Sequence, residues 1–196
     1  MSRYRGPRLK ILKRLGPLPG FGQKLNQKFQ EANTSLVKTN RKKKSPFTIR
    51  LKEKQKLRYN YGLTEKNLIQ YMKIARKKKT STGETLLKSL EMRLDNIVFR
   101  LGFGPTLPAA RQLITHGHIL LNGKKRNKPS SQCSLQDSIT LKTPHMASIP
   151  SSDSVPGFLS LETSTLTGKV QQLVSRQEVD FSINELLVIE YYSRNF

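Results

Sequence analysis

The sequence is poor in cysteine, tryptophan and acidic side chains. Its 196 residues include one cysteine, no tryptophan, and 13 Asp and Glu against 36 Lys and Arg. The single cysteine, Cys133, excludes an internal disulfide framework and a cysteine-based metal cluster, and it suits a reducing compartment. No stretch approaches the roughly 18 consecutive apolar residues that a membrane span requires. The basic N-terminus lacks the apolar core of a secretory signal, so we expect the chain to work in the compartment where it is made.

Positive charge is what the sequence has in excess. The formal net charge is +23, a self-repulsion that favours a polyanionic partner, either a nucleic acid or an anionic membrane. Residues 1–79 carry 24 Lys and Arg against 3 acidic residues, whereas residues 147–196 carry 3 against 6. This gradient predicts that the first part of the chain is embedded among the phosphate groups of a polyanion and that the tail contacts solvent or protein.

Residues 1–45 predict an extended basic arm that becomes ordered on a nucleic acid. They contain three prolines and four glycines without a sustained apolar period. The alternative is a basic tail without fixed contacts. For the run Arg41–Lys44, the alternative to a nucleic-acid contact is a run of charges that contacts only solvent.

Helical patterns follow between residues 46 and 116. Helices are predicted at 46–60, 64–79, 82–101 and 107–116, with Ser, Thr and Pro at their starts and Gly or a basic run at their ends. The pattern at 82–101 is the longest, with leucine or isoleucine recurring every three or four residues. The apolar face of the last helix is Leu107, Ala110, Leu113 and Ile114.

The periodicity changes to that of strands after residue 117. Strands are predicted at 118–121 and 138–142, and Asn122-Gly123 is a strong hairpin signal. Residues 143–157 are predicted to form a loop, and 158–181 are ambiguous, with a strand near Phe158 and a helix at Val170–Val174 as alternatives. A capping-box pattern at 182–185 starts a C-terminal helix. Its predicted apolar side is Ile183, Leu186, Leu187 and Tyr191.

The most specific pattern is MRLDNIVFRLGFGPTLPAARQLITHGHILLNGKK at 92–125. It resembles the small RNA-binding domain of ribosomal protein S4, which also occurs in several RNA-modifying enzymes and a tRNA synthetase. The flanking blocks resemble the ribosomal protein itself, in its plastid-encoded form. They are RYRGPRLK (3–10), RLKEKQKLRYNYGLTEKNLIQYMKIA (50–75), STGETLL (81–87) and INELLVIEYYSR (183–194).

The resemblance implies an α+β architecture. We expect an all-helical domain at 46–90 plus 182–196, preceded by the extended basic arm at 1–45. The RNA-binding module would be inserted at 91–181, with two helices packed on a small, mostly antiparallel sheet and a loop at 143–157. The C-terminal helix would pack back on the helices of residues 46–90.

The resemblance also implies a function without catalysis. Members of this family are structural constituents of the small ribosomal subunit. We expect direct binding to the 5′-domain junction of small-subunit ribosomal RNA, a part in nucleating assembly, and a contribution to translational accuracy and to the channel through which messenger RNA enters. Ribosomal proteins S5 and S3 are the expected neighbours, with no membrane and no homo-oligomer. The expected location is the plastid stroma rather than a bacterial cytoplasm.

Candidate RNA-binding residues lie in the arm, on the predicted helices of residues 46–79 and in the inserted module. In the arm, the cations could follow a phosphate groove and Tyr4 could stack on a base. In the inserted module, the helix starting near Leu107 presents backbone N–H groups to phosphate, although a turn or cap role is the alternative for the two histidines. Arg93 and Asp95, two positions apart in a predicted helix, are not expected to face each other. The candidates are Arg3, Tyr4, Arg5, Arg8, Lys10, Lys13, Arg14, Arg41, Lys42, Lys43, Lys44, Arg50, Lys54, Arg58, Arg76, Lys77, Arg111, Gln112, His116, His118, Lys124, Lys125 and Arg126.

No cofactor is expected. Some bacterial relatives bind zinc through cysteines of the arm, and this arm has none, although structural magnesium accompanying the RNA stays open. A rival interpretation is an RNA-modifying enzyme, such as a pseudouridine synthase, but no segment is long enough for a further catalytic domain. A membrane-surface protein would need an amphipathic helix with a broad apolar face and basic flanks, and none is found.

Overall fold

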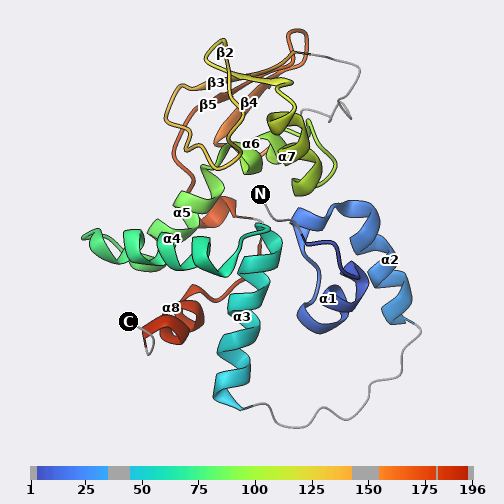
Figure 1. The fold of residues 1–196 in the computed structure, drawn as a ribbon, viewed down its shortest axis with the longest axis vertical. Coiled ribbons are helices and arrows are strands. Elements are labelled where there is room, and N and C mark those ends of the chain that lie inside the picture. The colour runs from blue at the N-terminus through green and yellow to red at the C-terminus, as the bar shows by residue number, and fades with distance from the viewer. Residues whose placement is uncertain (1–3, 35–44, 143–154, 180, 194–196) are drawn as a thin grey trace. The chain divides into compact units, whose positions relative to one another are not determined.

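The computed structural model describes residues 4–34, 45–142, 155–179 and 181–193 (Figure 1). The chain divides into two compact units. The helical unit comprises residues 1–85 and 181–196, and the mixed unit comprises residues 86–180. In the part of the chain that is described, no helix has the length and apolar character needed to cross a membrane.

The first two helices correct the prediction of an extended arm. Residues 8–34 fold into α1 (Arg8–Leu15), a 3-10 turn η1 (Pro19–Phe21) and α2 (Gln23–Thr34). The Asn60 amide oxygen accepts a hydrogen bond from Gly20 N at 2.9 Å, and a side chain at Gly20 would collide with the Asn60 carbonyl. The segment therefore folds because it docks on helix α3 (Pro46–Asn60), a contact that its proline and glycine content does not reveal. Leu9 is exposed, but six other apolar side chains of the segment are buried: Ile11, Leu12, Leu15, Leu18, Phe21 and Phe29.

Two further helices of this unit begin where the capping residues predicted, whereas the capping box predicted at 182–185 does not form: the last helix begins at Glu185, and Asn184 Oδ1 accepts from Leu186 N at 3.1 Å. Helix α3 (Pro46–Asn60) follows Ser45, whose Oγ accepts from Thr48 N at 3.3 Å. Helix α4 (Glu65–Lys77) follows Thr64, whose Oγ1 accepts from Asn67 N at 3.3 Å. Both caps satisfy backbone donors that a helix start leaves without partners.

The C-terminal helix α8 (Glu185–Ser193) lies against α3 (Figure 1). The predicted apolar side is partly wrong. Leu186 is 71% exposed, and the buried side chains of the helix are Val188 and Tyr192. Contacts from α3 set this rotation, because Arg50 pairs with Glu190 and Glu53 accepts from Asn184 N at 3.3 Å.

The helix predicted at 82–101 is broken into two. Helix α5 (Thr82–Glu91) and helix α6 (Leu94–Arg100) are separated by Met92 and Arg93, and Arg93 has an extended backbone, with φ −75° and ψ 142°. This pair joins a neighbouring segment, since Met92 O accepts from Cys133 N at 2.9 Å and Arg93 bridges to Gln132. The amphipathic period runs through the break, so the pattern alone could not reveal it.

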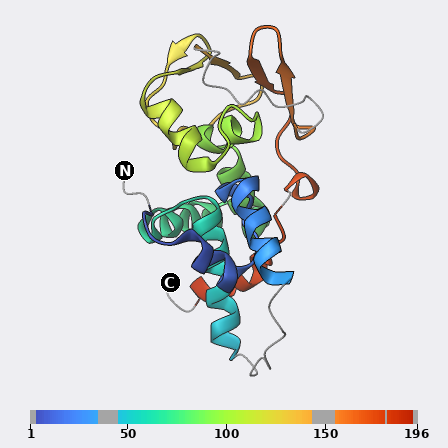
Figure 2. The same ribbon diagram turned by 90° about the vertical axis from the view of Figure 1, so that its right-hand side faces the viewer.

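A five-stranded antiparallel sheet completes the mixed unit, in the order β2-β1-β3-β5-β4. Figures 1 and 2 show α6 and α7 (Leu107–Thr115) together on one face of this sheet. Asn122 and Gly123 turn the first hairpin with φ 51° and 73°, as predicted. The strands are β1 (Ile119–Leu121), β2 (Lys124–Lys125), β3 (Ser138–Leu141), β4 (Leu159–Glu162) and β5 (Thr167–Val170).

The ambiguous segment 158–181 is a hairpin followed by a 3-10 turn. The helix considered at Val170–Val174 does not form, because Val170 ends β5 and is paired with Leu159 of β4. A short 3-10 turn, η4 (Arg176–Glu178), follows instead. Any side chain at Gly168 would collide with Leu101. The glycine therefore lets the sheet lie close to the end of α6.

Candidate nucleic-acid interface

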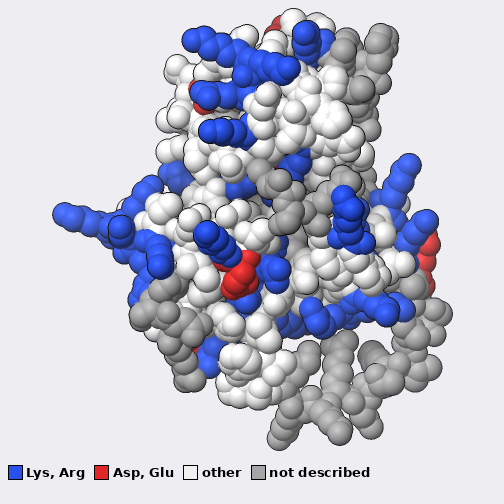
Figure 3. Space-filling model, viewed as in Figure 1, with Lys and Arg blue, Asp and Glu red and all other residues white. Residues whose placement is uncertain are grey.

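Exposed cations extend over both units (Figure 3). In the arm, Tyr4 is exposed with the cations around it, and Arg8 is half-buried with its guanidinium 5.9 Å from the centre of the Phe21 ring. Arg3 and the run Arg41–Lys44 lie outside the described residues. The predicted cations that the structure leaves exposed are Arg5, Lys10, Lys13, Arg14, Arg76, Lys77, Lys124, Lys125 and Arg126.

Three predicted RNA contacts on α3 take part in contacts inside the helical unit. Lys54 is only 5% exposed; its ammonium lies 3.0 Å from Glu65 Oε1 and 4.7 Å from the centre of the Tyr191 ring. Contacts inside the unit therefore occupy the Lys54 ammonium, and its assignment as an RNA contact stays a prediction. Arg50 pairs with Glu190, and Arg58 donates to Leu63 O at 3.4 Å.

The Glu65 carboxylate links α4 to both α3 and α8. Its Oε1 atom accepts from Tyr192 Oη at 2.6 Å as well as from Lys54. Burial alone would raise the pKa of Glu65, but the hydrogen bonds from Tyr192 and Lys54 outweigh it and lower the pKa. Burial and the bond to Glu65 raise the pKa of Tyr192. This cluster joins residues that are 127 positions apart in the sequence.

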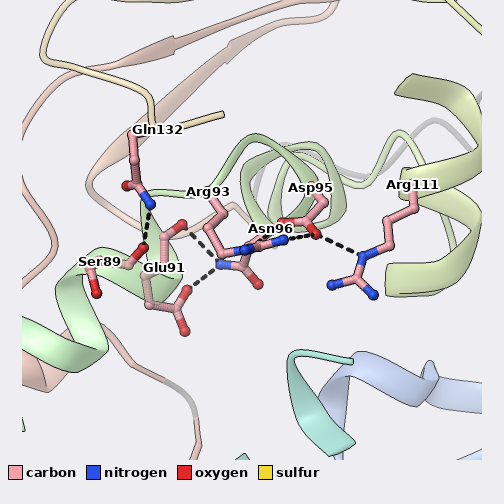
Figure 4. A network of polar contacts seen from close by, with 7 residues as sticks. All are labelled: Ser89, Glu91, Arg93, Asp95, Asn96, Arg111 and Gln132. Atoms are coloured by element: carbon pink, nitrogen blue, oxygen red, sulfur yellow. Dashed lines mark hydrogen bonds and ion pairs between the residues drawn. The ribbon is translucent and has the colours of Figure 1, made fainter. Parts of the chain in front are cut away.

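A second buried cluster surrounds Asp95 in the mixed unit (Figure 4). Arg93 donates two hydrogen bonds to this carboxylate, from Nε to Oδ1 at 2.9 Å and from Nη2 to Oδ2 at 2.8 Å. Arg111 of α7 adds a third, from Nε to Oδ2 at 2.7 Å. The expectation that Arg93 and Asp95 do not face each other is wrong, because Arg93 precedes α6 with an extended backbone and helical spacing does not apply to it.

Glu91 organises the same junction from the α5 side. Its carboxylate is buried and accepts from Asn96 Nδ2 and from the Arg100 guanidinium at 3.2 and 3.3 Å. Gln132 adds a hydrogen bond to Ser89 O at 2.9 Å (Figure 4). The acidic side chains of this region thus hold cations inside the fold rather than at the surface. Sequence reasoning missed this set; its only signal was the dense alternation of charge in 91–100.

The outer face of α7 borders a hollow of about 260 Å³. Two predicted site residues, His116 and His118, lie on it with their ring centres 6.2 Å apart and their planes 30° apart. The Lys125 side chain packs against Gly117, the residue between the two histidines, so closely that a side chain at Gly117 would collide with it. The lining residues are Phe103, Pro105, Ala109, Gln112, Leu113, His116 and His118.

No metal centre accompanies these features within the described residues, where no group of three or more His, Cys, Asp or Glu side chains comes together. Cys133 is buried, and burial raises the pKa of its thiol to about 12. A thiol with so high a pKa stays protonated near neutral pH and is a poor nucleophile. The exposed Lys and Arg side chains of the described surface are suited to hold a polyanion.

A unit of helices and a second unit of helices packed on an antiparallel sheet, both with exposed cations, form an α+β protein suited to bind a polyanion such as RNA. Comparison with known families agrees, since the S4 domain matches residues 92–139 and the ribosomal protein S4/S9 N-terminal domain matches residues 3–91. The chain belongs to the ribosomal protein S4 family.

Its similarity to individual relatives extends over the whole chain. It is 53% identical to the small ribosomal subunit protein uS4c of Chaetosphaeridium globosum and 54% identical to that of Chara vulgaris, with 99% of each chain covered. A cyanobacterial relative, uS4 of Thermosynechococcus vestitus, is 49% identical with the same coverage. The chain is of the plastid type, as its resemblance predicted.

Proposed function

We propose that this chain is a structural constituent of the small ribosomal subunit of a plastid and binds the ribosomal RNA of that subunit directly. The observation that carries the proposal is the separation of charges. Buried acidic side chains such as Glu91 and Asp95 bind cations inside the mixed unit, whereas most described cations of the arm and those of the 124–126 hairpin are exposed. A surface with this excess of positive charge is suited to a phosphate backbone.

The finer parts of the proposal follow the family. We infer that the chain binds the 5′-domain junction, helps nucleate subunit assembly, and contributes to accuracy and to the channel through which messenger RNA enters. The mixed unit would act as an inserted RNA-binding domain between two parts of a helical domain. The chain would work in the plastid stroma without bound zinc.

A neighbouring protein is proposed for the helical unit, with ribosomal proteins S5 and S3 as the candidates. Exposed apolar side chains support this, because Phe47 is 57% exposed and lies against Tyr191, with ring centres 5.9 Å apart. Leu186 on α8 and Ile74 on α4 are also exposed. Adjacent apolar side chains that are exposed or partly exposed together, as Phe47 and Tyr191 are, support a surface that a partner covers.

The deciding experiment measures the affinity of the full chain for small-subunit ribosomal RNA as a function of salt. Six to ten phosphate contacts predict a loss of roughly a thousandfold or more in affinity between 50 and 200 mM salt. Replacing Lys124, Lys125 and Arg126 together by Ala should make the salt dependence shallower. An affinity that hardly responds to salt would contradict the proposal, as would failure of the chain to sediment with small subunits on a sucrose gradient.

A further inference from the structure

Helix α7 has two distinct faces, and only one of them belongs to the core. Leu107, Ala110 and Ile114 are buried, and Thr106 Oγ1 caps the helix by accepting from Ala109 N at 3.2 Å. The other face carries Ala109, Gln112, Leu113 and His116, at the three- and four-residue spacing that places side chains on one side of a helix. These four residues border the hollow described above. The second stripe is therefore not needed to attach α7 to its unit.

The hollow combines an apolar floor with a polar rim. Phe103 is fully buried beneath it, and Leu113 and Ala109 form its helical wall. Gln112 and His116 are exposed at the rim, and within the described part of the chain neither side chain makes a hydrogen bond. An amide and an imidazole at the edge of an apolar hollow can donate to and accept from the edge of a flat heterocycle.

Its size limits what it can hold. The hollow measures about 260 Å³, which is below the ~300–1,000 Å³ range of pockets for whole small molecules. One planar ring system fits such a space, whereas a folded peptide segment or a complete nucleotide does not. The occupant should therefore project a single ring from a chain that lies outside.

The cations beside the hollow indicate the kind of polymer that carries the inserted ring. Lys125 lies across Gly117, between the two histidines of the rim, and the exposed Lys124 and Arg126 flank it. A phosphate backbone held by these cations would pass within reach of the rim. Single-stranded RNA offers unstacked bases that insert between aromatic and apolar side chains.

We propose that this hollow receives one unstacked nucleobase of the bound RNA, with the neighbouring phosphates on the 124–126 hairpin. The proposal rests on the RNA-binding function proposed above and adds a base-accepting subsite to it. Gln112 and His116 meet the base edge, and Leu113 meets its face above the buried Phe103. The subsite thus adds a contact that depends on the base to a surface otherwise directed at phosphate.

The test fills the hollow without changing the charge. In the full-length chain, Ala109→Leu places a larger side chain on the lining, and Thr115→Leu is the matched control on an exposed position of α7 outside it. Affinity for small-subunit ribosomal RNA should fall roughly five- to a hundredfold in Ala109→Leu, the range expected for one lost base stack. The slope of affinity against salt should stay unchanged, and Thr115→Leu should bind as the parent does.

Base-specific chemical probing of the same complexes identifies the nucleotide. The parent and Thr115→Leu should alter the reactivity of a base that Ala109→Leu leaves as in free RNA. Gln112→Ala combined with His116→Ala should show the same loss, which separates the subsite from a folding defect in Ala109→Leu. Equal affinity and an unchanged probing pattern in both pocket variants would overturn the subsite while RNA binding stands. If the parent chain itself does not bind the RNA, the proposed function and the subsite both fail.

Discussion

Arg93 and Asp95 form a bidentate ion pair in the mixed unit, and both side chains are almost completely buried. Both Asp95 oxygens accept from this one guanidinium, and Arg111 completes the set from α7. A buried carboxylate is tolerated only where its lone pairs are satisfied and its charge is balanced. The pair therefore fixes the start of α6 and ties it to α7.

Neutralising this carboxylate should destabilise the mixed unit strongly. Asp95→Asn keeps the shape but removes the negative charge with which the buried Arg93 pairs, a loss of about 3–5 kcal/mol in the free energy of unfolding. Denaturant titration checks this value. The control is Glu162→Gln, an exposed carboxylate on β4, which should change the free energy of unfolding by less than about 0.5 kcal/mol. Equal effects of the two substitutions would show that the ion pair does not hold this unit together.

Arg111 and Lys124 should respond differently to substitution, although both were predicted as RNA contacts. Arg111→Ala removes a hydrogen bond to a buried carboxylate and should lower the free energy of unfolding by roughly 1–3 kcal/mol. Lys124→Ala, on an exposed hairpin, should lower RNA affinity with little change in stability. Urea unfolding and RNA binding measured on both variants decide this. Equal stability of the two variants would contradict the structural role of Arg111.

The rotation of α8 predicts which of its apolar residues matter. Val188→Ala should cost about 2 kcal/mol in the free energy of unfolding, because Val188 is completely buried. Leu186→Ala should stay within about 0.5 kcal/mol of the parent, because Leu186 is largely exposed. Thermal unfolding of the two variants side by side measures the difference. A larger loss at Leu186 would mean that the helix packs through its other side.

The Glu65–Tyr192 bond predicts a dependence of stability on acid. The pKa of Glu65 is lowered in the folded chain, so its contribution is present above the unfolded pKa, near 4.5, and is lost as the pH falls through the folded pKa. Tyr192→Phe should weaken this dependence and cost about 1 kcal/mol near neutral pH, a modest value because Glu65 is 38% exposed. Unfolding measured from pH 7 to pH 3 tests this.

A matched variant separates that bond from the general effect of losing a tyrosine hydroxyl. Tyr59→Phe changes a partly exposed tyrosine of α3 and keeps the ring that contacts Tyr4 and Arg58. It should retain the acid dependence of the parent chain. If Tyr59→Phe and Tyr192→Phe have the same pH profile, the hydroxyl of Tyr192 does not set the pKa of Glu65.

Local signals in the sequence determined much of this protein. The caps at Ser45, Thr64 and Thr106 start helices where they were predicted, because a capping side chain bonds to a backbone donor only three positions away. Asn122-Gly123 turns its hairpin because both residues accept positive φ. The motif at 92–125 indicated the family, and the excess of Lys and Arg indicated a polyanionic partner.

Only the tertiary structure decided which side chains are buried, because burial depends on surfaces that are distant in sequence. Residues 8–34 form helices and turns because they pack against α3. Lys54 is buried because α8 packs against the part of α3 that carries it. Arg111 bonds to Asp95 only because α6 and α7 pack against each other. The outer face of α7 borders a hollow only because Phe103 and Pro105 lie beside it. Sequence patterns describe the two faces of one helix, whereas the partner of each face is fixed by the fold.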